Sequence, residues 1–262
     1  MKIQKKSWII GIILISVGVI GILFAWRLQE QDGQNVRSQT FDARKVEEIF
    51  VHLNVSDIEI KQSKDALIKV EWKEDKKAPV QVKMEKRKLI AKGKADVKKG
   101  LNLERNKSEI PLRLYLPAKE FQAIHLQNNV GDISANTIVT KDLSIISTTG
   151  DMKIKNGTTE TFSVRLLVGD IEAVDTTGEG QLETKTGDIT YEGATITKPL
   201  LCTTEVGDIT MRLKEKPKDV SFIVETDVGS VDVFQEKGNI HKNGAISVYA
   251  RTRTGDINIT DK

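Results

Sequence analysis

A four-residue motif recurs along this 262-residue chain and restricts the folds open to it. Each of its seven copies reads Thr or Val, then Gly, then Asp (Ser in one copy), then Ile, Met or Val. The glycines lie 19, 19, 18, 20, 22 and 26 residues apart. A repeat of about 20 residues is typical of stacked architectures, because one such unit cannot bury an apolar face alone. The repeated residues are Gly131, Asp132, Gly150, Asp151, Gly169, Asp170, Gly187, Asp188, Gly207, Asp208, Gly229, Gly255 and Asp256.

The hydrophobic pattern around each glycine predicts two strands joined by a tight corner. Apolar residues stand five and seven positions before the glycine and two and four positions after it, so the period is two. The buried parity changes at the glycine, where Gly can adopt a positive φ and Asp can bond nearby backbone N–H groups. Stacking such units about 4.8 Å apart forms an all-β, β-helix-like parallel solenoid of about seven coils. Cys202 falls in an inward column, which predicts a buried, inert thiol.

A basic segment interrupts the pattern upstream of the repeats. A degenerate eighth copy, with Ser56 in the place of glycine, lies in residues 55–58. Between it and the repeats, residues 61–107 hold 16 basic and 7 acidic residues, a net charge of +9, which leaves −6 for the rest of a chain of net +3. Strand-like runs at 66–72, 80–84, 88–91 and 111–116 predict a β cap over residues 46–120, with the repeats over residues 121–262. The residues that could contact anionic polymers are Lys76, Lys77, Lys86, Arg87, Lys88, Lys98 and Lys99. The simpler interpretation, which we favour for the sequence alone, is that they are ordinary solvated side chains on loops and edge strands, where Lys also discourages edge pairing.

An uncharged apolar run near the start of the chain predicts a membrane anchor. Residues 7–26 carry no charge, and a helix of 20 residues spans about 30 Å, the thickness of a bilayer core. We assign residues 7–27 to this single-pass anchor, residues 1–6 to a basic cytoplasmic tail, and residues 28–45 to a polar stalk. The C-terminal part is then expected outside the cell. A cleaved signal peptide is the alternative, but the run is longer than the usual apolar region of about 7–15 residues.

Composition and motifs exclude several kinds of chemistry. A single cysteine cannot form a disulfide within the chain, and one cysteine with three scattered histidines (His52, His125 and His241) does not make a usual zinc site. We find no nucleophile-elbow motif and no phosphate-loop or dinucleotide signature, so no cofactor is expected. The aromatic residues Phe162, Tyr191 and Phe222 fall in inward columns, which argues against a sugar-binding platform.

The corner aspartates admit two interpretations. As a column along one edge of the solenoid they could bind cations or supply acid–base chemistry, as in solenoid enzymes that act on acidic polysaccharides. Alternatively, each carboxylate caps its own corner. We favour capping, because bare carboxylates about 4.8 Å apart would repel one another unless backbone N–H groups bound them.

The motifs described above resemble those of the β-strand-repeat "putative adhesin" family of bacterial surface proteins. The resemblance rests on the repeated Thr/Val-Gly-Asp-Ile, on Leu114–Pro117, and on the lead-in residues Phe121, Ile124 and Leu126. With the N-terminal anchor, the chain looks most like membrane-anchored, Lia-type members encoded near cell-envelope stress systems. The resemblance implies a β-helix-like array at the cell surface, and it transfers no catalytic residues.

Two functions remain open at this point. The favoured one is a non-enzymatic surface interaction module, linked to envelope stress or adhesion, that is held in the membrane by its N-terminal helix. Its expected partners are anionic wall polymer, anionic lipid or an envelope protein, and nucleic acid is not expected for an exported domain. The alternative is a solenoid hydrolase or lyase that acts on a cell-wall or capsule polysaccharide.

Overall fold

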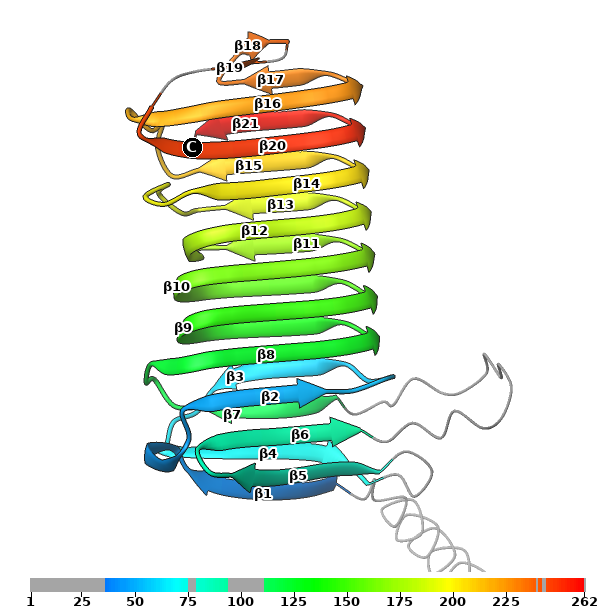
Figure 1. Cartoon of the computed structure of the whole chain (residues 1–262), viewed down its shortest axis with the longest axis vertical. Helices are drawn as coiled ribbons and strands as arrows, with labels where there is room; N and C mark the ends of the chain where they lie inside the picture. Colours follow the sequence, from blue (N-terminus) through cyan, green and yellow to red (C-terminus); the bar gives the residue numbers. More distant parts are fainter. Residues whose placement is uncertain (1–35, 75–78, 94–110, 239, 242–243, 262) are drawn as a thin grey trace, which may run out of the picture. The chain divides into compact units, whose positions relative to one another are not determined.

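In the computed structural model the Gly-Asp repeats form two-strand coils that stack in parallel register (Figure 1). The structure describes residues 36–74, 79–93, 111–238, 240–241 and 244–261. The predicted cytoplasmic tail, the membrane segment 7–27 and residues 28–35 of the predicted stalk lie outside these ranges. Within the described ranges, no helix has the length and apolar character needed to cross a membrane.

Each coil contributes one strand to each of two faces. The strands that precede a Gly-Asp corner are β2 (Glu48–His52), β8 (Phe121–Val130), β12 (Thr177–Thr186), β14 (Leu200–Val206), β16 (Val220–Val228) and β20 (Ile246–Thr254). The strands that follow it are β3 (Ile58–Gln62), β11 (Ile171–Val174), β13 (Ile189–Glu192), β15 (Ile209–Leu213), β17 (Val231–Val233) and β21 (Ile257–Asp261). β9 (Ile133–Thr149) and β10 (Met152–Val168) run around the second bend of their coils without a break, and so belong to both faces.

The hydrophobic core lies between the two faces. The apolar columns predicted from the sequence are buried there; for example, Leu182, Cys202 and Ala250 align in register on neighbouring strands. Gly180 makes room in one column, since a Cβ at this position would lie 2.3 Å from the ring of Phe162. The buried columns follow from the period-two pattern, because alternate side chains of a strand point to opposite sides.

The coils do not stack in chain order at their C-terminal end. β14 pairs with β20, and β20 pairs with β16, all in parallel, while β15, β21 and β17 follow the same order on the second face. The last coil in sequence, β20–β21, therefore lies between the coils β14–β15 and β16–β17 (Figure 1). Counting the degenerate copy, whose β2 and β3 pair with β8 and β9, eight corner-bearing coils are stacked.

Antiparallel strands close both ends of the stack. At the N-terminal end, β6 (Lys88–Gly93) and β7 (Leu112–Leu116) extend the two faces by one parallel strand each. β5 (Val80–Glu85) and β4 (Leu67–Lys73) then pair antiparallel with them. At the other end, β18 (Glu236–Lys237) and β19 (Ile240–His241) pair antiparallel with β17 and β16. Such pairing covers edges that would otherwise offer unpaired backbone groups.

Part of the predicted polar stalk is folded. β1 (Val36–Asp42) pairs with β4, and a 3₁₀ turn, Ala43–Lys45, follows it. The Asp42 side chain caps this turn by accepting a hydrogen bond from the Arg44 N–H, at 3.0 Å. The stalk prediction failed for this stretch because β1 lies at the edge of the sheet and its side chains are largely exposed, so its sequence carries no apolar period.

Candidate functional site

The seven motif glycines occupy corners that admit no side chain. Their φ angles lie between +128° and +150°. A Cβ on Gly187 would lie 2.0 Å from the carbonyl oxygen of Gly169 in the coil beneath, and one on Gly150 would lie 2.3 Å from the carbonyl oxygen of Gly131. Glycine is therefore required for two reasons: the backbone conformation and the close stacking of the corners.

Each corner aspartate binds the coil stacked on it. The Asp170 N–H donates to Asp151 Oδ1 over 3.0 Å, and the Asp208 N–H donates to Asp188 Oδ1 over 2.8 Å. The sequence predicted that each carboxylate would cap its own corner, whereas in the structure each one caps the neighbouring corner. The same bond recurs at the other corners, where the backbone N–H of the second residue donates to Oδ1 of the first: Asp57 and Asp132, Asp132 and Asp151, Asp170 and Asp188, Asp208 and Asp256, and Asp256 and Ser230. In the last of these, the bond from the Ser230 backbone lowers the pKa of Asp256.

A buried polar side chain closes most corners from the inside. Thr204 Oγ1 donates to the carbonyl of Gly187 over 3.1 Å, and Thr252 Oγ1 donates to that of Gly207 over 2.9 Å. At the first repeat the donor is Asn128, whose Nδ2 lies 2.8 Å from the carbonyl oxygen of Ser56. These bonds give the corners a structural role. In the part of the chain that the structure describes, no three His, Cys, Asp or Glu side chains are grouped so that they could hold a metal ion.

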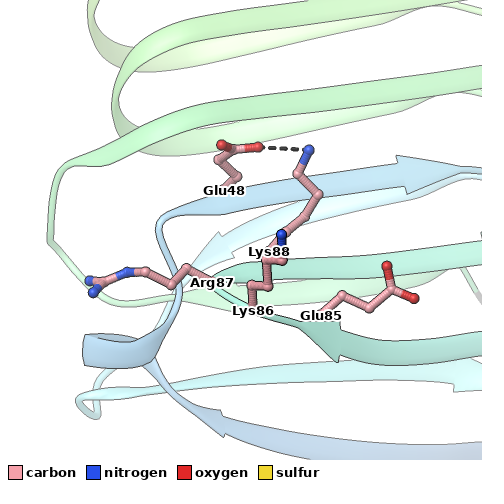
Figure 2. A pocket seen from close by; sticks show the side chains of 5 residues that line it. All are labelled: Glu48, Glu85, Lys86, Arg87 and Lys88. Atoms are coloured by element: carbon pink, nitrogen blue, oxygen red, sulfur yellow. Dashed lines mark ion pairs between the residues drawn. The ribbon is translucent and has the colours of Figure 1, made fainter.

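Three consecutive cations lie at the turn of the β5–β6 hairpin in the cap. Lys86, Arg87 and Lys88 lie where β5 turns into β6, and Lys86 adopts a φ of 54° there (Figure 2). Together with Glu48 and Glu85 they line a surface pocket. We name Lys86, Arg87 and Lys88 the cap turn. Of the other predicted contact residues, Lys76, Lys77, Lys98 and Lys99 lie outside the described residues.

Two acidic residues form ion pairs with the cap turn: Glu48, the first residue of β2, and Glu47, which precedes it. Arg87 lies 2.8 Å from Glu47, and Lys88 lies 2.8 Å from Glu48, which faces it in register across the parallel β2–β6 pair. All four side chains are at least 40% exposed, so water screens both pairs. Sequence reasoning missed Glu47 and Glu48, because their approach depends on the insertion returning alongside β2. The cap turn is thus a cationic surface that its own carboxylates partly neutralise.

A family model named Toastrack DUF4097 matches residues 46–165 and 91–260 of the chain. These ranges include the degenerate copy, the cap and all seven repeats. The chain belongs to the Toastrack family. A search of curated proteins found no relative.

Several solved structures resemble the Toastrack chain at low identity. A "putative cell adhesion protein" from Clostridium sporogenes is 20% identical, with a TM-score of 0.38 over 87% of this chain and 99% of that one. A "putative adhesin" from Bacteroides fragilis is 14% identical, with a TM-score of 0.45 over 88% and 98%. A "putative lipid binding protein" from Parabacteroides distasonis is 13% identical, with a TM-score of 0.36 over 88% and 98%. At these TM-scores the neighbours do not indicate what this chain does.

The remaining candidate side chains of this Toastrack domain are spread over the fold. Cys202 is fully buried, and burial raises the pKa of its thiol. His125 lies on the outer surface with Nδ1 3.9 Å from Asp142 Oδ2, and its ring centroid is 6.5 Å from that of Phe50. Trp72, the one tryptophan beyond the predicted anchor, is buried in the cap. None of these contacts joins a nucleophile to a base.

Proposed function

We propose that this chain is a non-enzymatic interaction module of the bacterial cell envelope whose cap binds anionic polymers. Residues 7–27 would anchor it in the membrane, with the solenoid outside the cell. Its ligands would be wall polymers or lipid headgroups, which share rows of phosphate or carboxylate groups. The resemblance to anchored, Lia-type members adds to this proposal a place in the response to envelope stress.

The observation that carries the proposal is the position of the cap turn. It places three consecutive cations on a tight, exposed bend, within a segment of net charge +9 on a chain whose remainder is −6. Flexible exposed cations suit a long polyanion better than a small ligand, because each contributes a small, additive attraction.

The alternative enzyme rested on the corner aspartates. Seven corner carboxylates, from Asp57 to Asp256, each accept a backbone N–H from the next coil. This structural role explains the column of aspartates without a substrate, and it removes the basis for a hydrolase or lyase.

The test is sedimentation of residues 37–262, which form one compact unit, with anionic vesicles, neutral vesicles and purified cell wall. We expect binding to the anionic surfaces, and a steep loss of binding between 0.01 M and 0.15 M salt, as the Debye length falls from about 30 Å to about 8 Å. Replacing Lys86, Arg87 and Lys88 with Glu should abolish binding, since each cation near an anionic surface contributes about 1 kcal/mol. The vesicle and wall arms separate the two sources of anionic groups.

The control reverses the same number of cations elsewhere. Lys153, Lys155 and Arg212 lie on the second face of the middle coils, and reversing them changes the net charge by the same amount. Binding should fall much less in this variant than in the cap variant. Salt-insensitive binding, or equal losses in both variants, would contradict the proposal.

A further inference from the structure

The last coil in sequence occupies a slot between two other coils. Val248 of β20 is in register with Leu200 of β14 on one side and with Phe222 of β16 on the other. On the second face, Ile257 of β21 lies between Ile209 and Val231. The coil β20–β21 is thus paired along both edges (Figure 1). Its apolar side chains are buried in the core between its neighbours.

The corner of this coil makes the same aspartate and threonine hydrogen bonds to both neighbouring corners as other repeats make. The Asp256 N–H donates to Asp208 Oδ1, and Asp256 Oδ1 accepts from the Ser230 N–H, both at 2.7 Å. Thr252 Oγ1 donates to the Gly207 carbonyl below, and the Gly255 carbonyl accepts from Thr226 Oγ1 above, both over 2.9 Å. The slot therefore recognises a segment with alternating apolar residues followed by Thr-x-Thr-Gly-Asp-Ile. Residues 246–261 supply that pattern.

The segment that leads into this coil begins with a strained turn. Phe234 and Gln235 link β17 to β18 with φ angles of 50° and 71°. Two-residue hairpin turns with two positive φ angles strongly favour Asn-Gly, and non-glycine residues are costly there. The Phe234 N–H also donates to the carbonyl of Ile259 in the last coil, over 2.8 Å. The strained turn therefore lies where the chain reverses direction after β17, before it continues to β20 and β21.

We infer that the slot between β14–β15 and β16–β17 accepts the last coil of a second copy of this chain, so that two copies exchange residues 236–261. Short connections under strain favour such exchange, because the connection relaxes when it extends to a neighbour. The exchange carries β18, β19 and the last coil together, so that their pairings with β17, β16 and β14 form again on the second copy, and only the turn at Phe234 and Gln235 opens. This inference is independent of the cap and of what the cap binds.

The test co-expresses two full-length copies that carry different tags. One has Thr203→Cys in β14 and the other has Arg251→Cys in β20. These positions are in register on adjacent parallel strands, at a separation that a disulfide can bridge, and Cys202 is buried and does not compete. We expect a disulfide-linked heterodimer on a non-reducing gel. Either variant paired with the wild-type chain should give none.

A second pair of variants tests the strained turn. Gln235→Gly accepts the positive φ and should lower the heterodimer fraction by about fivefold or more. Gln235→Ala keeps the Cβ and should leave that fraction unchanged. Absence of the heterodimer in the cysteine experiment would overturn the exchange, and an equal fraction in the two Gln235 variants would overturn the role of the turn.

Discussion

At the residue scale, the two imperfect corners mark the two ends of the stack. Ser56 replaces glycine in the first coil, and among the described residues no corner of this type lies beneath it to meet a Cβ. Ser230 replaces aspartate in the coil β16–β17, the last in space, where no further corner N–H needs a carboxylate. Interior corners need both residues, because each receives a neighbour on both sides. The Gly-Asp pair therefore determines both the turn within a coil and the contact between stacked coils.

Replacing Gly187 with Val should lower the free energy of unfolding far more than replacing Lys185 with Ala. A Cβ at position 187 would lie 2.0 Å from the Gly169 carbonyl oxygen, and its φ of +143° is costly for a β-branched residue, by about 1–3 kcal/mol before the clash is counted. Lys185 is exposed two residues away, so its loss should change stability by less than about 0.5 kcal/mol. Urea unfolding of residues 37–262 measures both. Equal midpoints would show that the corner tolerates side chains.

At the element scale, the strands were predictable and their order was not. The runs predicted at 66–72, 80–84, 88–91 and 111–116 correspond to β4, β5, β6 and β7, because half-buried strands show a clear period of two. The order of the coils could not be predicted in this way, because the inward-facing residues of β16 and β20 are both apolar. By this criterion either strand could pair with β14. The signals that remain are Ser230, which fits only a terminal corner, and the long spacings of 22 and 26 residues around it.

Disulfide trapping within a single chain tests the coil order. Thr203→Cys with Arg251→Cys should cross-link readily, since these residues are partners across β14 and β20. Thr203→Cys with Glu225→Cys should not, because Glu225 on β16 lies beyond Arg251, about 9–10 Å away at the usual strand spacing. Mass spectrometry of the oxidised variants gives the answer. The reverse result would mean that the coils stack in chain order.

At the scale of the whole molecule, charge is divided between the basic segment 61–107, of net charge +9, and an acidic remainder of −6. Composition alone predicted this division and the candidate residues Lys86, Arg87 and Lys88. It did not predict their carboxylate partners, since Glu47 and Glu48 are about 40 residues away in sequence and meet the cap turn only through the β2–β6 pair. These ion pairs compete with a ligand for Arg87 and Lys88.

The most direct test of the proposed binding site neutralises these partners. Glu47→Gln with Glu48→Gln frees Arg87 and Lys88 without adding a cation, and should tighten binding to anionic vesicles or wall by about tenfold at low salt. Glu172→Gln with Glu192→Gln makes the same change of net charge on the second face, where these residues pair with Lys153 and Arg212. A gain in affinity confined to the Glu47 and Glu48 variant is the predicted result. Equal affinity in the two variants, or a loss in the first, would contradict the assignment of the cap turn as the binding surface.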